Sequence, residues 1–158
     1  MLERLDYVKL APRRILDAGS GPPQRALGKR YRGAQVIALD FSLAMLRAGR
    51  RRFRFWESNP PHAVCGDLGR LPVAAAAIAL VWSNMALHWA ADPLAALREF
   101  HRVLAVEGLL MFSTLGPDTL AELRAAAGEA RVHRFADMHD LGDMLVAAGF
   151  AAPVMDME

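Results

Sequence analysis

The segment from residue 14 to residue 21, Arg-Ile-Leu-Asp-Ala-Gly-Ser-Gly, constrains the fold of this chain more than any other segment. Apolar residues lead into Asp17 and then into Gly19 and Gly21. This order predicts a buried strand that ends in a sharp turn, because glycine tolerates positive φ and the close approach of a ligand. A helix is predicted over 24–31, and the two prolines just before it suit a first helical turn. A strand, a glycine turn and a helix N-terminus together favour a nucleotide-like ligand with a negative group.

A second apolar segment, Gln35–Asp40, ends in a carboxylate about twenty residues after the glycines. In nucleotide-binding α/β folds, an acidic side chain at this position accepts hydrogen bonds from the ribose hydroxyls. Asp40 could also cap a helix that begins near Ser42, and the two roles are compatible. The glycine turn and the carboxylate at this separation make a cofactor site the favoured interpretation.

Further strands are predicted over 62–68, 77–83 and 109–114, and the strand over 77–83 is apolar throughout, as expected when both faces are buried. Helices are predicted over 92–104, 119–127 and 140–148, and a sixth strand begins over 152–157. In the helix over 92–104, Arg98, Glu99 and Arg102 are expected to point outward. Five strands that alternate with helices predict one α/β domain over residues 1–158, with a Rossmann-like, doubly wound parallel sheet.

Composition excludes several classes of protein. The single Cys65 excludes a disulfide framework and a multi-cysteine metal site, and no metal ligands are predicted. No apolar run approaches the roughly 20 residues that cross a bilayer, and the first nine residues are charged, so a cytoplasmic enzyme without a membrane partner is expected.

The basic residues are mostly arginines, and four of them would share one stripe of a helix beginning near Ser42: Arg47, Arg50, Arg51 and Arg54. The stripe is interpreted either as a solvated face or as a docking site for an acidic partner. No aromatic residues alternate with these arginines, so a nucleic-acid partner is not expected.

The pattern Asp17-x-Gly19-x-Gly21 after an apolar strand resembles the first motif of the class I S-adenosylmethionine-dependent methyltransferases, whereas a dinucleotide fingerprint would need glycine in place of Gln24. Members of that family usually have a further glycine where this chain has Pro23. The resemblance implies S-adenosyl-L-methionine as cofactor, with Asp67 and the backbone of Leu68 at the adenine. The residues implied to bind the cofactor are Asp17, Gly19, Gly21, Asp40, Phe41, Asp67, Leu68, Ser83 and Asn84.

Three later segments, 81–89, 112–124 and 132–140, resemble the malonyl-acyl-carrier-protein O-methyltransferases of biotin synthesis. The resemblance runs over nearly the whole chain. Members of that family begin earlier and continue further, so the chain is expected to be a methyltransferase core without the family's N-terminal helices and with incomplete C-terminal strands. The strand over 109–114 would then have an open edge, which predicts self-association or a mobile tail after Gly149.

The resemblance implies methyl transfer to the free carboxylate of a malonyl group carried by acyl carrier protein. A carboxylate is already a nucleophile at neutral pH, so positioning and the exclusion of water would suffice. His88 and Trp89 are expected next to the methyl group, and Arg124, His133 and Arg134 are candidates to hold the malonyl carboxylate. His88 could instead be a loop histidine bonded to backbone, and each arginine could form a surface ion pair.

Two alternatives remain from the sequence. The pattern of the helix over 119–127 is also similar to that of methyltransferase-like assembly factors of respiratory complex I, which implies modification of a protein arginine. The chain could also be a non-catalytic fold that binds a partner.

Overall fold

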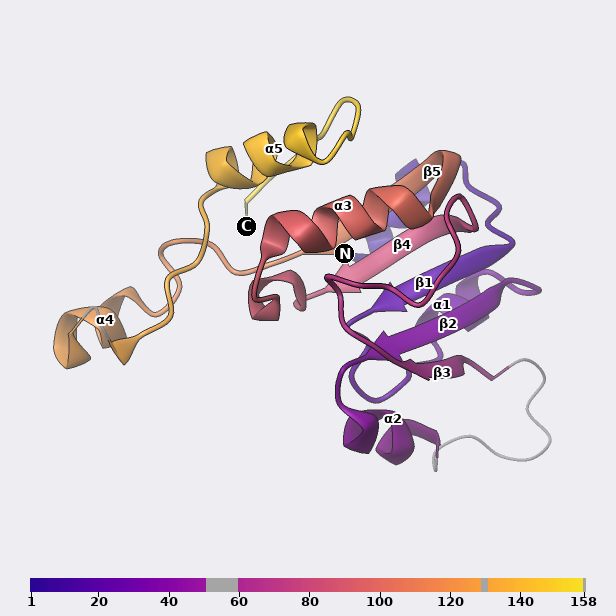
Figure 1. Ribbon diagram of the computed structural model, residues 1–158, viewed down its shortest axis with the longest axis horizontal. Coiled ribbons are helices and arrows are strands. Elements are labelled where there is room, and N and C mark those ends of the chain that lie inside the picture. Colours follow the sequence, from indigo (N-terminus) through magenta and orange to yellow (C-terminus); the bar gives the residue numbers. More distant parts are fainter. Residues whose placement is uncertain (51–59, 129–130, 158) are drawn as a thin grey trace.

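The computed structural model describes residues 1–50, 60–128 and 131–157, and a five-stranded parallel sheet forms its centre (Figure 1). The strand order is β3-β2-β1-β4-β5, and every neighbouring pair is parallel. The strands are β1 (Arg14–Ala18), β2 (Gln35–Asp40), β3 (His62–Cys65), β4 (Ile78–Asn84) and β5 (Leu104–Ser113). The predicted α/β class and parallel sheet are confirmed.

The centre of the sheet lies between β1 and its two neighbours. Leu16 of β1 is in register with Ile37 of β2 and with Val81 of β4. The chain order reverses between β1 and β4, since β2 follows β1 on one side and β4 is added on the other. In open α/β sheets the carboxyl ends of the strands on either side of such a reversal form a crevice for ligands.

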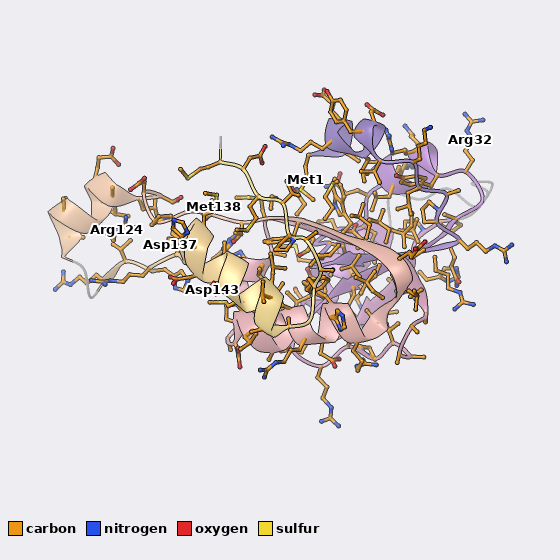
Figure 2. The ribbon with its side chains drawn as sticks, turned by 90° about the horizontal axis from the view of Figure 1, so that it is seen from above. Met1, Arg32, Arg124, Asp137, Met138 and Asp143 are labelled. Atoms are coloured by element: carbon orange, nitrogen blue, oxygen red, sulfur yellow. The ribbon has the colours of Figure 1, made fainter. Side chains whose placement is uncertain are left out.

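Helices cover both faces of the sheet. The helices of the structure are α1 (Ala26–Arg30), α2 (Leu43–Arg50), α3 (Pro93–Val103), α4 (Ala121–Ala127) and α5 (Met138–Ala147), with 3-10 turns η1 (Leu2–Tyr7) and η2 (Leu87–Trp89). Among them, α4 stands away from the sheet (Figure 1). Side chains of α3 and α5 pack in one core with Leu16 and Val81. Leu5 of η1 and Leu27 of α1 pack on the opposite face, with Ile15. In Figure 2 the pink α3 and yellow α5 accordingly lie opposite the violet N-terminal helices.

The predicted starts of two helices are wrong. The helix predicted from 24 begins at Ala26, and Pro23 precedes it, buried against α2: a Cβ built on Gly49 would lie 2.2 Å from Pro23 Cδ. The last helix begins at Met138 rather than 140, because the Asp137 carboxylate caps it by accepting a hydrogen bond from the backbone N–H of Asp140 at 2.8 Å. The first shift therefore accompanies packing against α2, and the second results from a cap within the same turn.

The predicted sixth strand is also wrong, since the described residues 152–157 contain no strand. This segment is held instead by side chains: Met155 packs on the core below α3 and α5, and Asp156 forms an ion pair with Arg4. Within the described residues β5 pairs with β4 alone, so it is an edge strand. Self-association through this edge stays a prediction.

The basic stripe falls mostly outside what the structure describes. Arg51 and Arg54 lie outside the described residues, and Arg47 is exposed on α2. The docking role of the stripe therefore stays a prediction.

Candidate active site

The glycine turn after β1 has the conformation that its sequence predicts. Gly19 and Gly21 have φ of +74° and +58°, values that favour glycine. The backbone N–H groups of Gly19 and Ser20 both donate to the carbonyl oxygen of Leu39, at 2.8 and 3.0 Å. A Cβ added to Gly19 would lie 2.2 Å from Cβ of Ala86. The turn is therefore fixed between β2 and the loop after β4.

Asp40 holds this turn from the end of β2. Its Oδ2 accepts a hydrogen bond from the backbone N–H of Gly21 at 2.8 Å, and its Oδ1 accepts one from the N–H of Ser42 at 2.8 Å. A carboxylate has about four acceptor positions, so roughly two are left for ribose hydroxyls. The alternative role of Asp40 as the helix cap is wrong, because α2 begins at Leu43 and the Oγ of Ser42 accepts from the N–H of Met45 at 3.4 Å. The ribose role stays a prediction.

Asp17 lines a cavity of about 140 Å³, together with residues of the glycine turn, β4, η1 and α1. Gly19 and Asn84 line the same cavity, and Leu2 closes it from η1. Burial raises the pKa of Asp17 to about 7, and the negative charge of Asp40 adds to this shift. A buried carboxyl group is stabilised in its ionised form by a cation or a hydrogen-bond donor, so this cavity suits the polar end of a ligand.

The cavity is smaller than the roughly 300 Å³ or more typical of ligand sites, and the rest of a nucleoside would extend along the carboxyl edge. Phe41 follows β2 there with 77% of its surface exposed. Asp67 follows β3, is exposed, and accepts a hydrogen bond from the backbone N–H of Gly69 at 2.6 Å through Oδ1. Leu68 is half-buried against the core. The residues present therefore fit a nucleoside-bearing cofactor.

The loop after β4 separates two predicted cofactor residues. Asn84 lines the cavity, and its Oδ1 accepts a hydrogen bond from Ser113 Oγ at 2.8 Å. Ser83 is fully buried, does not line the cavity, and its Oγ has no hydrogen-bond partner. Ser113 also accepts a hydrogen bond from the backbone N–H of Met85, whose φ is +55°. Sequence reasoning missed Ser113, although its place at the end of an adjacent strand was a usable signal.

His88 lies in a group of aromatic residues beside this loop. Its ring centroid is 5.2 Å from that of Trp89 and 5.7 Å from that of Phe135, and its Nδ1 is 3.4 Å from Oγ1 of Thr114. The ring of His133 lies 5.0 Å from Phe135. Burial lowers the pKa of His88, and His133 adds to this effect. The structure therefore brings Trp89 against His88 directly, and brings His133 near His88 through Phe135, which the sequence did not single out.

The two predicted arginines have different surroundings. The guanidinium of Arg124 donates to the backbone carbonyls of Pro117 and Thr119 in its own turn. It belongs to α4, which stands away from the sheet in Figure 1 and lies beyond Asp137 and Met138 of α5 in Figure 2. Arg134 is exposed. The structure therefore does not bring Arg124 into the His88 group.

Neither a metal site nor a membrane span is found in the part of the chain that the structure describes. That part has no group of three or more His, Cys, Asp or Glu side chains placed to hold a metal ion. It also has no helix with the length and apolar character needed to cross a membrane.

Comparison with known proteins gives one consistent result. Residues 16–112 match the model of a methyltransferase domain family. The whole chain is 56% identical to a malonyl-[acyl-carrier protein] O-methyltransferase of Methylovorus sp. and 53% identical to one of Gallionella capsiferriformans, and it spans 57% and 58% of their lengths.

Solved structures at lower identity support the fold. The YcgJ protein of Bacillus subtilis has a TM-score of 0.77 at 21% identity, over 94% of this chain and 67% of that one. An S-adenosylmethionine-dependent methyltransferase of Mesorhizobium loti has a TM-score of 0.71 at 23% identity, over 87% of this chain and 74% of that one. Because the family model covers more than half of the chain and the glycine turn lies within it, this chain belongs to the methyltransferase domain family.

Proposed function

We propose that this chain is the cofactor-binding part of an S-adenosylmethionine-dependent methyltransferase that methylates the free carboxylate of a malonyl group on acyl carrier protein. The observation that carries the proposal is the 56% identity, over all of this chain, to a relative of that name. Because the chain spans 57% of that relative, substrate and partner belong to the proposal.

The residues after β1 and β2 would hold S-adenosylmethionine. The free acceptor positions of Asp40 suit the ribose hydroxyls, and Asp17 suits the cationic end of the amino-acid part. The exposed ring of Phe41 and the carboxylate of Asp67 suit the adenine. When bound, this cofactor supplies an electrophilic methyl group on a sulfonium.

The His88 group would face the acceptor. A malonate carboxylate needs no general base, so the protein has to orient it and keep water away. Because the pKa of His88 is lowered, its ring is neutral at pH 7 and does not form an ion pair that would weaken the nucleophile. Trp89, with 77% of its surface exposed, offers an apolar surface to the acyl thioester.

The comparisons do not favour the two alternatives. The relatives that match the whole chain at 42–56% identity are named malonyl-[acyl-carrier protein] O-methyltransferases. A role in assembling respiratory complex I has no comparable support.

Transfer of a radiolabelled methyl group from S-adenosylmethionine tests the proposal. Label should enter malonyl-acyl carrier protein as a base-labile ester, and acetyl-acyl carrier protein, which has no free carboxylate, should stay unlabelled. Base-stable label on a protein arginine, or equal labelling of acetyl-acyl carrier protein, would contradict it.

A further inference from the structure

The connection between β3 and β4, residues 66–77, carries Asp67 and Leu68 but contains no helix or strand, only an isolated bridge between Asp67 and Arg70. The backbone N–H of Arg70 donates to the carbonyl of Asp67 at 3.2 Å, which closes a tight turn. Such a short local turn does not fix its own position relative to the sheet. The N–H of Gly66 donates to the carbonyl of Asp40 at 3.1 Å, which ties the start of the connection to β2, and the N–H of Ala76 ties its end to α3. The residues between these ends need a further anchor.

Two side chains of α3 hold this connection. Glu99 accepts a hydrogen bond from the backbone N–H of Leu71 at 2.7 Å. Arg102 donates to the carbonyl of Leu71 at 3.1 Å and to that of Val73 at 3.0 Å. The guanidinium also donates to both carboxylate oxygens of Glu99, at 2.6 and 2.8 Å. The Glu99–Arg102 bridge thus fastens the backbone of Leu71–Val73 to α3.

Close packing links this anchored segment to Asp67. A Cβ built on Gly66 would lie 3.0 Å from Cδ of Pro72, so the two ends of the turn are in contact. Leu71 is 4% exposed and packs in the core with α3. A displacement of Leu71–Val73 would therefore be transmitted to Asp67.

An exposed ion pair three residues apart on a helix usually contributes little to stability. The Glu99–Arg102 bridge differs because its members bond to backbone groups 28 to 31 residues away in the chain. The Glu99 side chain is 19% exposed, which limits screening by water. Its bidentate geometry also fixes the direction of the remaining guanidinium donors.

We infer that Glu99 and Arg102 are positioning residues that place the Asp67–Leu68 turn against the purine ring of the cofactor. Through this turn they determine how strongly the protein distinguishes a 6-amino from a 6-oxo purine. This inference rests on the proposed function. It predicts that removing the bridge weakens recognition of the base more than it weakens the fold.

The experiment compares two ligands by calorimetry: S-adenosylhomocysteine, and S-inosylhomocysteine, which carries a 6-oxo group in place of the 6-amino group. The protein should prefer the adenosyl ligand. Arg102→Gln should weaken adenosyl binding about tenfold and reduce the preference, because a charge-assisted network is lost. Arg102→Lys should recover only part of it, since lysine cannot bind bidentately. Arg98→Gln, at an exposed position of the same helix, is the matched control and should change neither value.

A double-mutant cycle identifies the route. In an Asp67→Asn background, Arg102→Gln should cause little further loss of preference, because both changes act on the same contact. If Arg102→Gln fails to fold, Glu99→Gln, which keeps the size of the side chain, replaces it in the same measurements. Failure of the unmodified protein to bind S-adenosylhomocysteine would overturn the proposed function. If Arg102→Gln binds normally and keeps its preference for the adenosyl ligand, and only its unfolding midpoint is lowered, the positioning role alone is overturned.

Discussion

The carboxyl edge of the sheet has two halves that are built differently. After β1 and β2, the ligand-facing geometry is made by backbone: glycines at positive φ, N–H groups tied to Leu39, and a carboxylate that accepts two further N–H groups. After β4 and β5, it is made by side chains in ring contacts, with Trp89 largely exposed. Substitutions in the backbone-built half are expected to disturb the fold. Substitutions in the side-chain-built half are expected to alter substrate binding and leave the fold in place.

The largest expected effect is at the turn that joins the two halves. Gly19→Ala introduces a Cβ 2.2 Å from Ala86 at a φ of +74°, so the loop after β4 has to move. We expect a loss of roughly 3 kcal/mol or more in the free energy of unfolding. Gly21→Ala has a similar φ but open space, so it should cost about 1 kcal/mol. Urea unfolding of both variants checks this, and equal losses would show that contact with Ala86 is unimportant.

Asp40→Ala should damage fold and binding together. It leaves the partly buried N–H groups of Gly21 and Ser42 without their acceptor, at roughly 1 kcal/mol for each. Affinity for S-adenosylhomocysteine should fall by at least about tenfold. Asp40→Asn retains one oxygen acceptor, so its stability and affinity should lie between those of Asp40→Ala and of the unmodified protein. If Asp40→Ala unfolds like the unmodified protein, Asp40 does not hold the turn.

Asp17→Asn should stabilise the free protein as pH rises. The pKa of Asp17 is about 7 in the folded state against 3.8, so the unfolded chain loses its proton first. Stability therefore falls between about pH 4 and pH 7, by up to ~1.4 kcal/mol per pH unit, and is level above that. Asparagine removes this slope, so the variant should gain on the order of 2 kcal/mol relative to the unmodified protein between pH 5 and pH 7. Urea unfolding of both proteins at pH 5 and pH 7 checks this, and an equal loss of stability in the two proteins would contradict it. The affinity of Asp17→Asn for the cofactor should drop.

The smallest effect on folding is expected in the side-chain-built half. Trp89 is 77% exposed, so Trp89→Ala should change the free energy of unfolding by no more than about 0.5 kcal/mol. Methyl transfer to the malonyl substrate should fall roughly ten- to a hundred-fold, because the acceptor is less well positioned. Tyr7→Ala, at an aromatic residue 89% exposed on η1, is the control and should leave transfer unchanged. Equal losses in both variants would remove Trp89 from the acceptor site.

The sequence by itself determined the central strands and the backbone-built half of the site. Gln35–Asp40 was predicted with the observed bounds, and β4 begins and ends within one residue of its prediction. A strand buried on both faces needs a continuous apolar run, and only glycine readily turns as Gly19 and Gly21 do. These constraints act on the residue itself, so neighbours in sequence are enough to reveal them. The resemblance carried by the later segments likewise agrees with the names of the relatives that match the whole chain.

The tertiary structure decided which groups individual side chains meet. Ser83, predicted at the cofactor, is buried without a partner, and Arg124 bonds to carbonyls of its own turn instead of approaching His88. Glu99 and Arg102, expected to point into solvent, bond to the connection after β3. A long side chain such as that of Arg124, Glu99 or Arg102 can reach several hydrogen-bonding groups. Which of them it meets is fixed by how the layers pack, and no local pattern records that packing.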